Sequence, residues 1–324
     1  IADAGPDIFI CQESSGIIGG TPAGYGGAPG YTYSWSPATG LNNSNVANPT
    51  ATLTATTTYT LTVTDAAAVE ATSEVTVYVN QTASLPYSED FESGSGGWHS
   101  GGTGSSWQLG APSGSTININ APGGGISSWM TGLFVFYNNY ENSWVQSPCF
   151  DFSMLQSDPT ISMNVWWNSE TGWDGTVLQS SIDGGQTWQR VGNMGQPVNW
   201  YTDNAIEGNP GGQSTGWTGR VSSGAGSGGW VTASHLLNGL AGSSDVRLRI
   251  AFGADSTVRD DGFAFDNINI TPAPLAASAG PNVTVCPGDM AIIGGNPTAI
   301  DGVAGYSWTG RVSSGAGSGG WVTA

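Results

Sequence analysis

Polar and apolar residues alternate along much of this chain. From residue 50 to 64 the sequence reads TATLTATTTYTLTVT, in which threonines alternate with side chains such as Leu, Tyr and Val. A period of two places successive side chains on opposite faces of a β-strand, so this stretch predicts a strand with one buried face. No window has the sustained spacing of apolar residues that is typical of a helix. The pattern predicts an all-β chain.

The first 80 residues contain several short predicted strands separated by turn-forming residues. Beside the threonine-rich stretch, these strands are DIFICQ, SSGIIGG, YTYSWSP and SEVTVYV. Short strands at near-regular spacing are typical of a small β-sandwich. We expect Trp35 to anchor its core and Tyr59 to be a structural tyrosine near a late strand.

A second pattern repeats at long range. Residues 4–23 read AGPDIFICQESSGIIGGTPA and residues 279–298 read AGPNVTVCPGDMAIIGGNPT, so that Cys286 follows Cys11 by 275 residues. Two copies of one module are therefore separated by a larger and different module. This arrangement is typical of a long alternating array.

The first module resembles the Ig-like or PKD-like repeats of large surface adhesins and gliding proteins of Bacteroidota. The resemblance covers residues 2–79 and rests on AGPD, the Cys that follows, YSWSPATGL and TTTYTLTVTD. It implies an Ig-like sandwich in a protein that leaves the cell by type IX secretion and stays on the surface. Such repeats usually carry a second Cys after TVTD, where this chain has AAAVEA, so Cys11 lacks its expected partner.

The middle of the chain resembles the MAM-like or carbohydrate-module-like jelly rolls that accompany those repeats. This segment begins with LPYSEDFESGSGGW at residue 85 and closes with FAFDNINI at residues 263–270. The resemblance implies two antiparallel sheets with aromatic side chains between them. The aromatic residues expected in this core are Trp98, Trp107, Phe150, Trp166, Trp188 and Phe265.

The chain is thus predicted to contain a sandwich over residues 1–80, a jelly roll over 81–272, and a partial second sandwich over 273–324. The stretch WTGRVSSGAGSGGWVTA occurs both at residues 217–233 and at residues 308–324. Its first occurrence suits the jelly roll, whereas the second interrupts the repeated module. Recent gene conversion, deliberate design, and an artefact of reconstruction or of a sequence boundary are three explanations of the second occurrence, and we favour the artefact.

The net charge of the chain argues against two classes of binding partner. The chain has no lysine, six basic residues and 24 acidic residues, which give a net charge of −18. Such a chain repels nucleic acid and anionic membrane, so neither is an expected partner. The sequence has no apolar run long enough to span a bilayer and no recognisable signal peptide. Its first residue is Ile1 rather than Met, so we expect a mature product or a piece of a longer protein. This composition favours a secreted, cell-surface protein.

The cysteines and histidines offer no recognisable catalytic pattern. Cys11, Cys149 and Cys286 cannot all pair within one chain, and which of them pair stays open. Cys149, in SPCF, is expected to be a small buried side chain rather than a nucleophile. His99 and His235 accompany no Ser–His–Asp arrangement and no zinc-ligand spacing. We therefore predict that the chain is not an enzyme.

Three carboxylates are the candidate metal ligands. Asp90 and Glu92 lie in EDFE near the start of the predicted jelly roll, and Asp266 lies in FDNI near its end. Jelly rolls of the kind that the chain resembles place these first and last strands side by side, and a structural calcium often ties them together. Hard carboxylate oxygens are the ligands that Ca²⁺ prefers, so Ca²⁺ is the expected cofactor. The alternative is that these acids cap turns and face water.

The stretch SIDGGQTW, at residues 181–188, matches the Asp-box pattern S-x-D-x-G-x-T-W. We expect Asp183 to cap a tight hairpin, the two glycines to adopt positive φ, and Trp188 to pack beneath the turn. Sialidases carry this motif as a structural hairpin away from the active site, so it does not indicate hydrolysis.

The segment VWWNSETGWD, at residues 165–174, supplies the candidate ligand-binding residues. Adjacent positions of a strand face opposite ways, so one of Trp166 and Trp167 is expected in the core. An aromatic platform for sugar could then be formed by the candidates Trp167, Trp173, Glu170 and Asp174. The alternative is that these side chains pack against neighbouring loops or modules.

These observations lead to one interpretation with two alternatives. We interpret the chain as a repeating structural unit of a long extracellular adhesin or surface fibre that provides reach and attachment. Its expected partners are neighbouring copies of the same repeat or chain, and cell-surface glycans. The first alternative is a carbohydrate-binding module carried on the jelly roll. The second is an accessory region of a larger secreted hydrolase.

Overall fold

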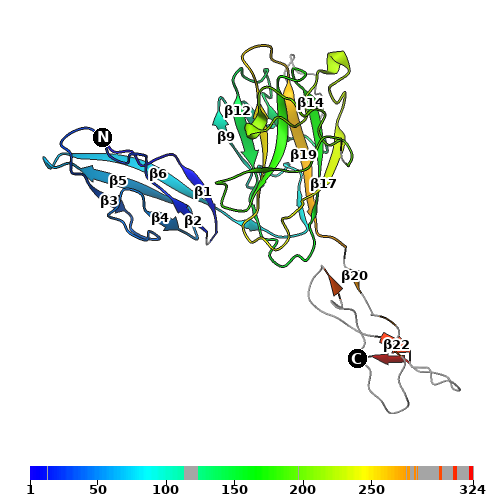
Figure 1. Cartoon of the computed structure of the whole chain (residues 1–324), viewed down its shortest axis with the longest axis horizontal. Helices are drawn as coiled ribbons and strands as arrows, with labels where there is room; N and C mark the ends of the chain where they lie inside the picture. The colour runs from blue at the N-terminus through cyan, green and yellow to red at the C-terminus, as the bar shows by residue number, and fades with distance from the viewer. Residues whose placement is uncertain are drawn as a thin grey trace. The chain divides into compact units, whose positions relative to one another are not determined.

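The computed structural model describes residues 1–12, 14–112, 123–195 and 197–274, together with short segments beyond residue 275. The chain divides into two compact units, Ile1–Thr271 and Pro272–Ala324. The described residues form strands, turns and two short 3-10 turns, η1 (Pro210–Gly212) and η2 (Val221–Ser223), which confirms the predicted all-β class (Figure 1). No helix in this described part is long and apolar enough to cross a membrane.

The first part of unit Ile1–Thr271 is a small sandwich. Its main sheet has the strand order β1-β6-β5-β3, with a parallel pairing of β1 and β6, and β2 pairs separately with β4. These strands are β1 (Ile8–Cys11), β2 (Ser15–Ile17), β3 (Thr32–Ser36), β4 (Thr50–Thr52), β5 (Thr57–Thr64) and β6 (Glu70–Asn80).

The two aromatic residues expected in this sandwich are both in its core. Trp35 is 2% exposed, and its indole N–H donates a hydrogen bond to the carbonyl of Val46 at 2.9 Å. Tyr59 is buried, and its hydroxyl donates to the carbonyl of Thr39 at 2.6 Å. Each ring therefore packs in the core while its polar atom donates a hydrogen bond to a loop carbonyl, as buried Trp and Tyr side chains usually do.

The larger part of the same unit is built from two further sheets. The first comprises β8 (Tyr87–Glu89), β10 (Trp107–Gly110), β11 (Ser128–Thr131), β14 (Thr160–Asn168), β17 (Val231–Leu236) and β19 (Gly262–Thr271). The second runs in the order β16-β15-β18-β12-β9 and comprises β9 (His99–Thr103), β12 (Asn142–Gln146), β15 (Gly175–Ser181), β16 (Gln189–Arg190) and β18 (Arg247–Gly253). The early strand β8 pairs antiparallel with the late strand β19, as expected for this jelly roll.

An aromatic cluster fills the space between these two sheets. Five of the six rings expected to be buried are buried, namely Trp98, Trp107, Phe150, Trp166 and Phe265. Trp188 is only half-buried, so that expectation was wrong. Trp166 packs in a separate small cluster with Met130, away from the main core. Trp98, Trp107 and Phe265 meet by tilted and edge-to-face contacts, with ring centroids 5.6 to 5.8 Å apart.

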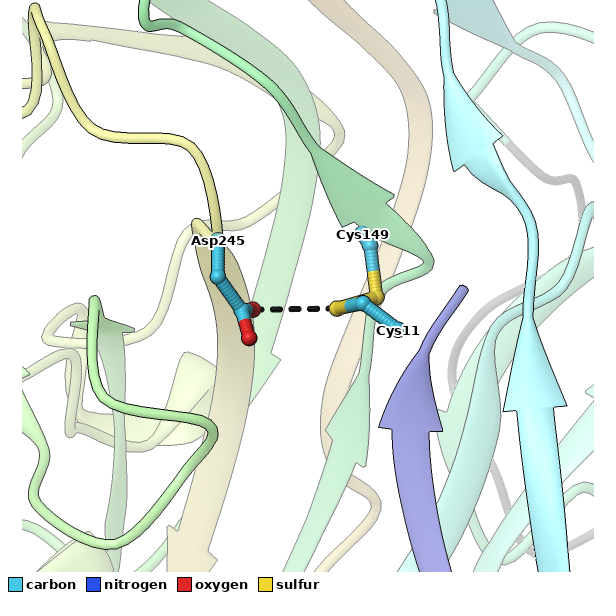
Figure 2. A group of neighbouring side chains, drawn as sticks. All are labelled: Cys11, Cys149 and Asp245. Atoms are coloured by element: carbon cyan, nitrogen blue, oxygen red, sulfur yellow. Dashed lines mark hydrogen bonds between the residues drawn. A yellow bond between two sulfur atoms is a disulfide. The ribbon is translucent and has the colours of Figure 1, made fainter. Parts of the chain in front are cut away.

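A disulfide joins the sandwich to the jelly roll. The bond connects Cys11, the last residue of β1, to Cys149 in β13 (Cys149–Phe150) (Figure 2). Strand β7 (Thr82–Ala83), in the connecting segment, pairs with the same β13. Cys11 therefore has a partner after all, in the following part of the chain. Cys149 is buried, as expected, but it is oxidised rather than a free thiol.

Polar groups surround this bridge. Asp245 Oδ1 lies 2.9 Å from Cys11 Sγ, a contact rather than a hydrogen bond because an oxidised sulfur has no proton to donate. Arg247 Nε lies 3.1 Å from Asp245 Oδ1 and balances its charge. The same arginine donates through Nη1 to the carbonyl of Phe9 at 2.8 Å. The guanidinium of Arg247 thus contacts both the sandwich, at Phe9, and the jelly roll, at Asp245.

A stacked pair of rings adds to the connection. Phe9 of β1 lies against His99 of β9, with ring centroids 3.7 Å apart and an interplanar angle of 15°. Burial lowers the pKa of His99 to about 4, so this imidazole is neutral near pH 7. A neutral ring can stack on Phe9 without the cost of burying a charge.

The predicted partial second sandwich and the repeated tail lie mostly outside the described residues. In unit Pro272–Ala324 the described strands are β20 (Ala276–Ala277), β21 (Ala299–Ile300), β22 (Thr309–Arg311) and β23 (Trp321–Thr323), with β22 paired to β23. The first occurrence of the repeated stretch belongs to the jelly roll, where Trp217 and Ala233 are buried in the main core.

The disulfide can be tested directly. Peptide mapping without reductant should recover one linked pair of peptides that contain Cys11 and Cys149. Cys149→Ala should lower the free energy of unfolding by about 2–4 kcal/mol, because the open chain regains conformational entropy. Cys286→Ala is the control and should leave the linked pair intact. Recovery of Cys149 as a free thiol from protein purified without reductant would contradict the assignment.

Candidate functional site

The outer face of the five-stranded sheet carries a row of polar and aromatic side chains. Along β12, Ser143 and Val145 point to the core, whereas Asn142 and Trp144 occupy the opposite face. The register places Trp144 between Ala251 of β18 and Gly101 of β9. The next row on the same face consists of Gln146, Arg249 and Gln179.

Trp144 lies directly on the backbone of its neighbouring strand. A Cβ atom added to Gly101 would come within 2.5 Å of Cη2 of this indole, so only glycine leaves room for the ring. The ring also meets His99 edge-on, with centroids 5.5 Å apart. Trp144 is half-buried, and the sheet supports its ring from beneath. The result is a fixed aromatic surface at the sheet face.

A hollow of about 420 Å³ opens beside this ring. Its lining comes from three strands and from η1, and it offers hydroxyl, amide and guanidinium groups beside the indole. The lining residues are Gly102, Thr103, Asn142, Trp144, Gly211, Gly212 and Arg249. An aromatic surface with a few convergent polar groups is the usual make-up of a small-molecule binding site.

The Asp-box motif folds as predicted and borders this region. The carboxylate of Asp183 accepts hydrogen bonds from the backbone N–H of Thr187 at 2.9 Å and from its hydroxyl at 2.5 Å. These bonds, led by the hydroxyl of Thr187, lower the pKa of Asp183 to about 2. Gly184 and Gly185 adopt φ values of 75° and 86°. The indole of Trp188 donates to the carbonyl of Gly185 at 2.9 Å, which fixes its ring beneath the turn.

Trp188 in turn supports Arg249. The guanidinium carbon lies 4.2 Å from the centroid of that indole, a cation–π contact. Arg249 Nε donates to Oε1 of Gln179 at 2.7 Å, and Gln179 is oriented by donating from Nε2 to the carbonyl of Gly211 at 2.9 Å. Burial lowers the pKa of Arg249 to about 10, and its side chain forms no ion pair among the described residues.

The residues that the sequence suggested for ligand binding do not form one surface. Trp173 is 48% exposed, whereas Trp167 is only 7% exposed and its indole donates to the carbonyl of Ala225. Trp167 therefore belongs to the core and cannot form an open platform, which corrects the prediction for that residue. Both tryptophans of β14 are buried. Trp167 faces the main core, and Trp166 lies in the separate cluster that Val221 and Trp230 pack against.

Glu170 and Asp174 meet a third carboxylate, that of Asp255. One oxygen from each of these residues lies within 4.8 Å of the others. Asp174 is buried and accepts hydrogen bonds from the hydroxyl of Tyr137 at 2.6 Å and the backbone N–H of Asp255 at 2.8 Å. Burial raises the pKa of Asp174 to about 7, and burial also raises the pKa of Glu170. Asp174 thus holds two loops together.

Asp90 and Glu92 follow β8 and lie near enough to Asp266 of β19 for their charges to add to the rise that burial causes in its pKa. The three carboxylates are not among the groups of described residues whose ligand atoms all lie within 4.8 Å of one another. Asp266 is buried, and burial raises its pKa to about 6, with a further contribution from the charges of Glu92 and Asp90. Glu92 Oε1 accepts hydrogen bonds from the backbone N–H groups of Ile126 and Ser127 at 2.7 and 2.8 Å. The set contains carboxylates alone, which suits a hard divalent cation, and Asp266 has no cationic partner among the described residues.

Trp144, Arg249 and Gln179 were not among the residues suggested by the sequence. The sequence signal for Trp144 and Arg249 is the alternation in NSWVQ and in VRLRIAFG. It places Trp144 on one face of the first strand and Arg249 on one face of the second. That signal becomes informative only once the two strands are known to be neighbours in one sheet.

Comparison with known proteins identifies no family. No protein-family model matches the chain, and no curated protein matches it. A solved carbohydrate-binding module of the β-sandwich superfamily is 13% identical with a TM-score of 0.33, covering 82% of this chain and 93% of that chain. The K1 cleaved adhesin domain of Lys-gingipain from Porphyromonas gingivalis W83 is 13% identical with a TM-score of 0.34, covering 58% and 98%. The xylan-binding CBM22-1 domain of Xyn10C from Paenibacillus barcinonensis is 12% identical with a TM-score of 0.33, covering 59% and 96%. With identities and TM-scores this low, function has to be argued from the chain's own geometry.

The raised pKa values of Asp174 and Asp266 predict how the free energy of unfolding depends on pH. The folded protein holds the proton of Asp174 more tightly than the unfolded chain does, so this group's contribution to stability is full below pH 4 and declines up to pH 7. We therefore consider the difference between the unfolding free energies of wild type and of Asp174→Asn, measured in EDTA so that no metal contributes. This difference should decrease from pH 4 to pH 7. The same difference for Asp266→Asn should stop decreasing near pH 6. The lowered pKa of His99 makes the free energy of unfolding rise with pH. Because His99 is present in wild type and in both variants, its contribution cancels in each difference. Differences that stay constant with pH, measured by chemical denaturation, would contradict these assignments.

Proposed function

We propose that the chain is an extracellular, non-catalytic glycan-binding protein and that the hollow beside Trp144 is its sugar site. The observation that carries the proposal is the indole of Trp144, which lies on Gly101 and borders a hollow lined by hydroxyl, amide and guanidinium groups. A flat apolar ring can stack on the C–H face of a pyranose while the polar groups bond its hydroxyls. Because the ring rests on backbone, it loses little freedom when a ligand binds.

The lining of the hollow favours binding without hydrolysis. A glycosidase of the usual kind needs two carboxyl groups that flank the scissile bond. The described residues that line this hollow include no Asp, Glu, His or Cys. The proposed site therefore has groups to hold a sugar and none of the groups that would cleave it.

The disulfide favours a second, structural role within the same protein. It ties the sandwich to the jelly roll next to the Arg247–Phe9 hydrogen bond and the Phe9–His99 stack. A covalent link between two modules suits a unit of an adhesin or surface fibre that must hold its binding face away from a surface. The wider proposal, that neighbouring copies of this repeat form a stalk exported by type IX secretion, rests on the internal repeat at 275 residues.

We further propose a structural Ca²⁺ held by Asp90, Glu92 and Asp266. Three carboxylates near the junction of β8 and β19 supply hard oxygen ligands, and burial of Asp266 without a cationic partner in the described chain supports the choice. A bound cation would offset the repulsion among these charges and fasten the two strands.

The position of the sugar site can be tested by comparing two tryptophans. On an array of neutral and acidic oligosaccharides, Trp144→Ala should weaken binding by about tenfold or more, because the stacking surface is lost. Trp173→Ala removes an exposed indole from the other candidate position and should leave binding unchanged. The reverse result would move the site to Trp173. Absence of binding by wild type to every glycan on the array would count against the proposed function itself.

Calcium binding can be tested by thermal unfolding. Adding Ca²⁺ to protein stripped with EDTA should raise the melting temperature at pH 7.5. The rise should shrink below pH 6, where protonation of Asp266 competes with the metal. Asp266→Asn should abolish the rise, and Glu207→Gln, which removes an exposed carboxylate elsewhere, should retain it. An equal rise in wild type and Asp266→Asn would contradict the site.

A further inference from the structure

The outer face of the five-stranded sheet concentrates positive charge in an acidic chain. The net charge of the chain is −18 and it has six basic residues. Three of them, Arg190, Arg247 and Arg249, share this face, because Arg190 and Arg249 flank Gln179 in the register and Arg247 precedes Arg249 by two positions. Such clustering against the overall charge calls for an explanation.

Two of these arginines are already engaged by the protein. Arg247 is paired with Asp245. Arg190 donates to the carbonyl of Gly192, to the side-chain oxygen of Asn193 and to the hydroxyl of Thr215. The third, Arg249, uses only Nε, which donates to Gln179. No hydrogen bond or ion pair within the described chain engages its two terminal nitrogens.

Arg249 is nevertheless held in one orientation. Trp188 covers one face of the guanidinium at 4.2 Å, Gln179 bonds its Nε, and the Asp-box hairpin fixes Trp188. The side chain lines the hollow beside Trp144, so its free N–H groups are available to a ligand there. A half-buried cation without a carboxylate partner is costly, and an anionic ligand would supply the missing charge.

The geometry points to the kind of anion. Trp144 faces Ala251, two positions from Arg249 on the same face of β18, so the backbone positions of Trp144 and Arg249 are diagonal neighbours, roughly 7 Å apart. That separation suits a sugar whose carboxylate is attached directly to the ring. One unengaged guanidinium calls for one negative charge, and a polyanion would be repelled by the rest of the chain.

We propose that the hollow selects acidic sugars, with the pyranose ring on Trp144 and the sugar carboxylate bound by the terminal nitrogens of Arg249. The planar guanidinium matches the two oxygens of a carboxylate. This inference rests on the proposed glycan-binding function and adds the class of sugar that is bound.

The test uses pairs of glycans that differ only in a carboxylate. Each uronic acid glycan on an array is paired with its counterpart reduced to the neutral hexose, and sialylated and sulfated glycans are included. Wild type should prefer the carboxylate member of at least one pair by about tenfold or more, the size expected of a charge-assisted hydrogen bond. Arg249→Gln should lose this preference and bind the two members of each pair equally, whatever its overall affinity.

Two variants separate the site from general charge effects. Arg259→Gln removes the same charge from an exposed position and should keep the preference. Arg249→Lys keeps the charge without the planar fork and should show a reduced preference, with the melting temperature of each variant checked against wild type. The inference would be overturned if wild type bound both members equally or preferred sulfated glycans. It would also be overturned if the preference survived in Arg249→Gln or was lost in Arg259→Gln. Equal binding that is lost in Trp144→Ala would overturn this inference and leave the proposed function standing.

Discussion

Side chains alternate between the two faces of every β-strand, and this constraint decides both the core and the candidate site of the jelly roll. On β12 and β18 the inward positions Val145, Leu248 and Ile250 are completely buried. The intervening outward positions are then left for Trp144 and Arg249. A shift of one residue in register would exchange the two sets, so burial of the apolar residues also orients the ring and the guanidinium.

Features that depend on nearby residues could be predicted from the sequence. The all-β class, the core positions of Trp35 and Tyr59, and the Asp183 hairpin follow from alternation and from hydrogen bonds within a few residues. The pairing of the first and last strands of the jelly roll followed from a resemblance.

Features that depend on strand neighbours could not be predicted in the same way. Trp167 was expected to be open, but it faces the main core with Phe263, and Trp166 takes the opposite face of β14. Trp188 was expected to be buried, but it lies beneath Arg249 at the surface. The sequence alone does not single out Trp144, because its ring rests on Gly101, and the strand that carries Gly101 becomes its neighbour only in the folded sheet. For the same reason, the partner of Cys11 could not be identified from the spacing of cysteines alone.

The bond between Cys11 and Cys149 also changes how the protein would respond to mechanical force. A pull applied along the backbone across unit Ile1–Thr271 reaches Cys11 and then passes through the sulfur atoms straight to β13. The residues between the two cysteines form a closed loop that this load bypasses, and they include most of the sandwich and strand β12 with Trp144. While the bond is intact, tension can lengthen the chain only outside that loop. A pull between the two ends of this unit would therefore not stretch the backbone segment that carries the aromatic platform.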